Sequence, residues 1–211
     1  LGFTLFPELS KLWAVENRDS AVSLLRKVII VYLSLVLPFI VLLVMAGSDI
    51  LLMLTTKDYI ISSGILFLLS CNLGLLGLYQ ISLYVIFLEH GSVSSLKLMA
   101  IVSGINILFN ALFVPEYGML GAAIAGFISN SVLAGVTIYL SKKCLQWQFP
   151  WSASIKITAR SLFMGLIIWI GVNSFDFGLA GLIIILSIAG AAYGVMDFFS
   201  KKDSFSSIII R

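Results

Sequence analysis

Residues 104–125 have the sequence GINILFNALFVPEYGMLGAAIA, in which Glu116 is the only charged residue. This stretch covers parts of two segments, 98–115 and 117–141, that contain no Asp, Glu, Lys, Arg or His. Each is close to the length of about 20 apolar residues that an α-helix requires to cross a bilayer. Because almost nothing separates them, the stretch predicts a helical hairpin within a membrane.

The same pattern extends over the rest of the chain. Four further apolar segments complete the set, at 28–48, 59–88, 157–175 and 177–196, and only the third of these four contains a charged residue. The third of these includes Arg160, whose long side chain is expected to reach the membrane surface. The six segments predict an all-α fold, a polytopic membrane helical bundle of about six transmembrane helices. We expect residues 1–211 to form a single transmembrane domain.

The composition excludes an ordinary soluble domain and a nucleic-acid-binding protein. Hydrophobic residues make up 60% of the 211 residues and charged residues 11%, whereas soluble proteins contain about 25% charged residues. The net charge of +3 is modest, and the basic residues lie between apolar segments rather than in a cluster. Membrane lipid is therefore the expected partner, and no nucleic acid is expected.

The distribution of Lys and Arg predicts the orientation. If the N-terminal segment is cytoplasmic, twelve of the thirteen Lys and Arg residues lie on that side, and Lys57 alone lies outside. Cytoplasmic loops of membrane proteins carry such an excess of positive charge. Both ends of this chain are therefore predicted to be cytoplasmic.

The sequence contains no arrangement of residues typical of a soluble enzyme's active site. His90 is the only histidine, and no spacing typical of metal ligands or of a Ser-His-Asp triad occurs. We therefore expect no enzyme activity, no cofactor and no metal. The alternative from another class is a membrane-bound polysaccharide ligase or glycosyltransferase, which would need several carboxylates and arginines around a donor diphosphate. Glu116 stands alone in its outer loop.

Polar amides lie inside the apolar segments, where facing lipid would be costly. They are candidates for the wall of a substrate cavity: Asn72, Gln80, Asn106, Asn110 and Asn130. The alternative is that they form hydrogen bonds between helices, each worth about 0.6 kcal/mol on average. Both interpretations stay open at the level of sequence.

Pro38 lies at the centre of the first segment and removes one backbone hydrogen bond of a helix there. It is a hinge candidate for alternating access, and the alternative is a static kink stabilised by neighbouring helices.

Small residues recur every four positions at the start of the fourth segment, which predicts a helix packing face. Two such rows begin at Gly118 and Gly121, and a second face is predicted near the end of the chain. The packing candidates are Gly118, Gly121, Ala122, Ala125, Gly126, Gly190 and Gly194.

The run Gly104–Ala125 resembles a signature of polysaccharide-export flippases of the O-antigen type, in the MOP superfamily. That superfamily also contains the lipid II flippases and the MATE drug exporters. The matching features are helix asparagines, Pro115, a Tyr-Gly turn and a Gly-Ala-Ala helix start, and residues 5–10 (LFPELS) also resemble a helix end of the family. The resemblance implies the C-terminal lobe of a MATE-like, two-lobe flippase.

The resemblance further implies a function in surface polysaccharide synthesis. Such a carrier moves an undecaprenyl-diphosphate-linked oligosaccharide across the bacterial inner membrane. The alternatives are a lipid II flippase or a MATE-like exporter of drugs or metabolites.

Two features of the chain bear on this expectation. It begins at Leu1 with a short apolar run, so we expect an N-terminal lobe of the same protein to be a partner. No Lys or Arg lies deep in a segment, so the diphosphate is expected to bind mainly in that other lobe, or the assignment to this branch is too narrow.

Overall fold

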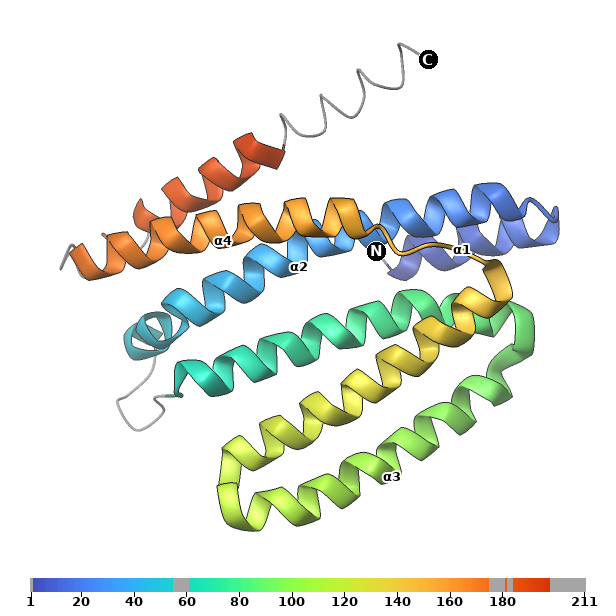
Figure 1. Cartoon of the computed structure of the whole chain (residues 1–211), viewed down its shortest axis with the longest axis horizontal. Helices are drawn as coiled ribbons and strands as arrows, with labels where there is room; N and C mark the ends of the chain where they lie inside the picture. The colour runs from blue at the N-terminus through green and yellow to red at the C-terminus, as the bar shows by residue number, and fades with distance from the viewer. Residues whose placement is uncertain (1, 55–60, 175–180, 182–183, 198–211) are drawn as a thin grey trace. The chain divides into compact units, whose positions relative to one another are not determined.

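The computed structural model describes residues 2–54, 61–174, 181 and 184–197. The described chain is helical, and no strand occurs within these ranges. Four helices follow one another, α1 Gly2–Ala14, α2 Arg18–Leu54, α3 Ser63–Leu145 and α4 Trp151–Ser174. A shorter apolar helix, Ile184–Asp197, comes last (Figure 1). The predicted all-α fold is confirmed.

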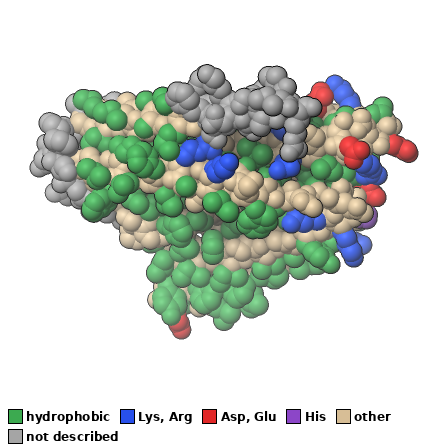
Figure 2. All heavy atoms as spheres, turned by 45° about the horizontal axis from the view of Figure 1, so that its top comes forward, with side chains coloured by type: hydrophobic (Ala, Val, Ile, Leu, Met, Phe, Trp, Pro, Cys, Tyr) green, Lys and Arg blue, Asp and Glu red, His purple; other side chains and the backbone are tan. Residues whose placement is uncertain are grey.

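Three of these helices are long and apolar enough to cross a membrane, over Arg18–Leu51, Ser63–Leu145 and Trp151–Val172. On the face drawn in Figure 2, hydrophobic side chains cover much of the described surface. Such a surface is suited to lipid rather than to water. The chain is therefore a polytopic helical membrane protein, as the sequence predicts.

Helix α3 contains three helical segments rather than one. Gly91 (φ 72°) and Gly118 (φ 54°) have non-helical backbone angles, and the chain reverses at both (Figure 1). Positive φ costs glycine nothing because it has no Cβ. The first segment comprises residues 63–90, the second 92–117 and the third 119–145. Residues 89–97, which lie between the predicted segments 59–88 and 98–115, are therefore helical except at Gly91.

A tight turn joins α1 to α2. Glu16 adopts a left-handed conformation (φ 54°), which ends α1. The Asn17 side chain then accepts a hydrogen bond from the backbone N–H of Ser20 at 3.1 Å, which caps the start of α2. These two residues set where the first long helix begins.

The chain divides into two compact units. The first comprises residues 1–33 and 64–151, and its core contains Tyr79, Val102, Leu133 and Ala134. The second comprises residues 34–63 and 152–211, and its core contains Ala46, Met164, Ile168 and Ala189. The single transmembrane domain over residues 1–211 stays a prediction.

Two polar contacts bring three helix ends together at one end of the first unit. Arg18, at the start of α2, pairs with Glu89 at 3.4 Å, and His90 lies 3.5 Å from the sulfur of Cys144. The start of α2 and the ends of the first and third segments of α3 therefore meet. Residues 55–60, which include Lys57, residues 175–180 and residues 198–211 lie outside the described residues.

The orientation itself stays a prediction, which thiol labelling of single-cysteine variants of the full-length protein tests. A membrane-impermeant reagent added outside should label Ser48→Cys and Glu116→Cys. It should label Lys143→Cys only after the cells are permeabilised, because Lys143 is predicted to be cytoplasmic. The reverse pattern would contradict the predicted topology.

Candidate functional site: a polar groove in α3

A groove of about 380 Å³ lies along α3 in the first unit. Its lining combines apolar side chains with amides and hydroxyls from the second and third segments: Met99, Val102, Ser103, Asn106, Ile107, Ser129, Asn130 and Leu133. No Lys, Arg, Asp or Glu is part of this lining. The groove, called the α3 groove below, therefore offers hydrogen bonds without formal charge.

Two of the predicted asparagines meet beside the α3 groove. Asn130, which lines it, donates to the Asn72 side-chain oxygen at 3.2 Å. Asn72 is buried and donates to the backbone oxygen of Ala123 at 3.4 Å. A Cβ at Gly126 would lie 3.0 Å from the Asn72 amide nitrogen, so this glycine leaves the amide its space. The pair joins the first and third segments and fixes the orientation of Asn130.

Asn106 and Asn110 lie one turn apart on the second segment. The Asn110 side chain donates to both the backbone oxygen and the side-chain oxygen of Asn106, at 2.9 and 3.0 Å. Asn110 therefore positions Asn106, and Asn106 is the one that lines the α3 groove.

Gln80 is separate from this group. It is exposed, and it donates to the Tyr84 hydroxyl at 3.3 Å, one turn along the same helix.

The predicted packing residues have different environments. Gly121 is buried, and a Cβ there would collide with the backbone of Phe113. The second and third segments of α3 can therefore approach each other closely beside the turn at Gly118 only because residue 121 is glycine. Ala125 is fully buried, whereas Ala122 is exposed.

The predicted second packing face is on the last described helix. An added Cβ at Gly190 or Gly194 would meet nothing within 4 Å. Within the described part of the chain, no neighbour packs against these two glycines.

Pro38 lies inside α2, and the helix continues without a break on both sides of it. Its role as a hinge stays a prediction.

Several polar residues that the sequence analysis did not select take part in the structure. The Tyr79 hydroxyl is buried and, among the described residues, has no hydrogen-bond partner. Its ring packs against Val102 and Leu133 of the groove wall.

Arg160 pairs with Asp197 at 3.0 Å, and both side chains are largely buried. The sequence contains a signal for this ion pair, since a charged side chain inside an apolar segment requires a partner.

The long apolar helices define a multi-pass helical membrane protein, with an uncharged polar groove in its first unit. The family model described as lipid II flippase MurJ matches residues 1–190. The chain therefore belongs to the lipid II flippase MurJ family. The expected flippase superfamily is confirmed, whereas the O-antigen branch of it stays a prediction.

Two individual proteins are similar to the chain. A solved structure of lipid II flippase MurJ, in an inward closed conformation, matches with a TM-score of 0.78 at 22% identity, covering 97% of this chain and 43% of that one. An uncharacterized membrane protein of Methanocaldococcus jannaschii is 26% identical over 149 residues, which is 71% of this chain and 29% of that protein. The chain thus spans less than half the length of either.

Proposed function

We propose that the protein containing this chain moves a lipid-linked glycan precursor across the inner membrane. The α3 groove carries this proposal, because it places amides and hydroxyls inside an apolar bundle of a flippase family. The chain would supply part of the carrier, and an N-terminal lobe of the same protein would supply the rest. Alternating access would then open the carrier to each side of the membrane in turn.

The α3 groove would contact the glycan rather than the diphosphate. Asn106 and Asn130 offer donors and acceptors that match sugar hydroxyls. A diphosphate is bound best by Arg or Lys, and the lining of the groove has neither. Arg160 is already neutralised by Asp197. The diphosphate would therefore bind mainly to the N-terminal lobe.

Lipid II is the first candidate substrate, because the family whose model matches the chain is described by that substrate. An undecaprenyl-diphosphate-linked oligosaccharide for surface polysaccharide is the second, supported by the resemblance of residues 104–125 to flippases of the O-antigen type. Either activity is transport without covalent chemistry, unlike that of a ligase or glycosyltransferase.

A flipping assay tests the proposal. The full-length protein is reconstituted into liposomes with fluorescent lipid II or with a fluorescent lipid-linked oligosaccharide, and the label on the outer leaflet is quenched over time. Transfer of lipid II supports the first candidate, and transfer of the oligosaccharide alone supports the second. If neither lipid is transferred faster than in empty liposomes, the proposed function is wrong.

Asn106→Leu should reduce the rate of flipping about tenfold, the effect of losing roughly 1.4 kcal/mol of hydrogen bonding to substrate. Gln80→Leu is the matched control, because it removes an amide that lies outside the groove. That control should leave the rate within about twofold. Equal losses in both variants would show that the groove has no special role in transport.

A further inference from the structure

The backbone of α2 lacks one helical hydrogen bond at Pro38. Proline has no N–H, so it cannot donate to the carbonyl of the residue four positions earlier. That residue is Ser34, and it is buried, with 7% of its surface exposed. In a membrane an unsatisfied carbonyl has no water to bond. The Ser34 carbonyl therefore requires a donor from elsewhere in the protein.

Tyr193 supplies that donor. Its hydroxyl lies 2.7 Å from the Ser34 backbone oxygen and donates to it. Tyr193 belongs to the last described helix, which is far from Ser34 in the sequence but lies in the same compact unit. Its ring packs against the core formed by Ala46, Met164 and their neighbours.

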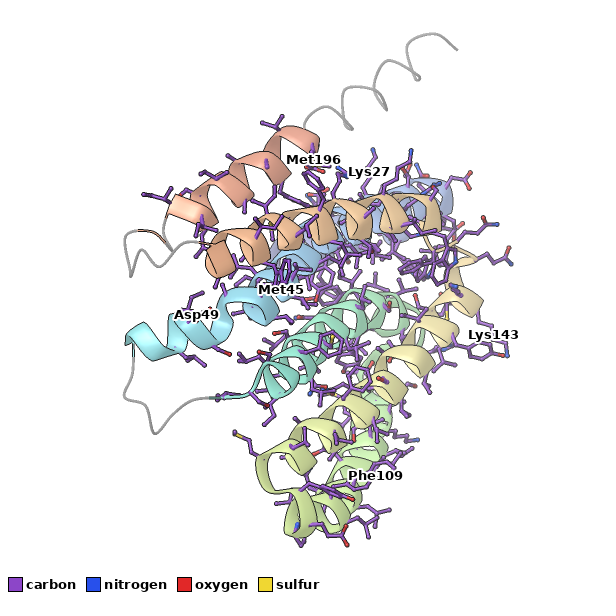
Figure 3. The ribbon with its side chains drawn as sticks, turned by 60° about the vertical axis from the view of Figure 1, so that its left-hand side comes forward. Lys27, Met45, Asp49, Phe109, Lys143 and Met196 are labelled. Atoms are coloured by element: carbon purple, nitrogen blue, oxygen red, sulfur yellow. The ribbon has the colours of Figure 1, made fainter. Side chains whose placement is uncertain are left out.

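A second polar contact holds the same helix in place. Asp197, one turn after Tyr193 on the same helix face, pairs with Arg160 of α4 at 3.0 Å. Helix α4 in turn approaches α2 closely just beyond the proline, because a Cβ at Gly165 would lie 2.5 Å from Val41. Figure 3 labels Met45 on this part of α2 and Met196, next to Asp197, on the last described helix. The Arg160–Asp197 ion pair and the close packing of α4 on α2 thus hold Tyr193 beside the Ser34 carbonyl.

We propose that Tyr193 is the positioning residue for the bend of α2, because its hydroxyl replaces the backbone bond that Pro38 removes. A proline inside a helix is expected to kink it. While the Tyr193 bond is present, the Ser34 carbonyl has a fixed partner and this bend keeps one angle. When the bond is lost, the carbonyl has no fixed partner and the bend varies. The boundary between the two compact units falls next to this carbonyl, between Leu33 and Ser34. The proposal does not depend on which substrate the protein carries.

A double-mutant cycle in the full-length protein tests the stability of this contact. Tyr193→Phe should lower the folding equilibrium constant about tenfold, the effect of leaving a buried acceptor unpaired. In a Pro38→Ala background the N–H of residue 38 bonds Ser34 within the helix, so Tyr193→Phe should change the constant less than about twofold. Equal effects in both backgrounds would overturn the proposal. Tyr79→Phe is the control, because that hydroxyl has no partner among the described residues, and it should not lower the constant.

Distances across the proline test the bend directly and do not depend on stability. Lys27 and Asp49, both labelled in Figure 3, are replaced by cysteine in a background without other cysteines, and a spin label is attached to each. Double electron–electron resonance spectroscopy then gives the distribution of distances between the two labels. Tyr193→Phe should broaden this distribution, and adding Pro38→Ala should make it narrow again. An unchanged distribution in Tyr193→Phe would overturn the proposal even if the protein were less stable.

Discussion

Asp197→Asn is expected to lower the free energy of unfolding by about 3 kcal/mol, because it leaves the Arg160 guanidinium largely buried without its counter-charge. The side-chain exposures of the pair are 11% for Arg160 and 19% for Asp197, so water compensates little of the loss. Denaturant unfolding of the full-length protein in detergent measures the change.

The control for this pair is the double variant Arg160→Met with Asp197→Leu. Replacing both partners by apolar residues of similar size is often neutral or stabilising, because no charge is then buried. The double variant should therefore be at least as stable as the original protein. If Asp197→Asn cost less than about 1 kcal/mol, the pair would behave like an exposed salt bridge.

Gly77→Ala is expected to cost about 3 kcal/mol of stability. An added Cβ would collide with the Tyr32 ring, which packs directly on this glycine. The ring would have to move, and its hydroxyl would lose the hydrogen bonds that it donates to the backbone oxygens of Leu73 and Gly74, at 3.2 and 2.9 Å. The expected cost combines overpacking with lost hydrogen bonds.

Gly135→Ala is the matched control for this substitution. Gly135 lies in the third segment of α3, and a Cβ there would meet nothing within 4 Å. The change should stabilise the protein by up to about 1 kcal/mol, since alanine has the higher helix propensity. If both glycine variants shifted the unfolding midpoint in the same direction, the Tyr32 contact would not be the cause.

Hydrophobicity alone predicted the helical fold, because a bilayer needs long apolar helices whatever their sequence. A break between two apolar segments was also predicted at Glu116, and the structure places the turn two residues later, at Gly118. The turn at Gly91 falls within residues 89–97, which were predicted as a loop because Glu89, His90 and Lys97 separate two segments without charge. In the structure this stretch is helical except at Gly91, and Ser95 within it is buried. One glycine is sufficient for the reversal.

The sequence shows which polar residues lie inside apolar segments, but not their partners. Asn72 and Asn130 lie inside two different apolar segments, and the structure pairs them. Which amides meet depends on how each helix is rotated about its axis, and hydropathy contains no information on this rotation. Arg160 was expected to reach the membrane surface, which stays a prediction, and the structure adds a partner, Asp197, that hydropathy did not reveal.

The single-residue breaks at Gly91 and Gly118 also restrict how α3 can change in evolution. An α-helix turns by about 100° per residue, so inserting or deleting one residue near Gly118 would rotate everything after it by that angle. Asn130 would then face away from both Asn72 and Asn106. A long loop could change its conformation and leave the helix orientation unchanged. A turn of one glycine cannot, so the following helix would rotate by the whole angle. Length variation should therefore be tolerated poorly between residues 91 and 130, so that this part of the chain evolves by substitution alone.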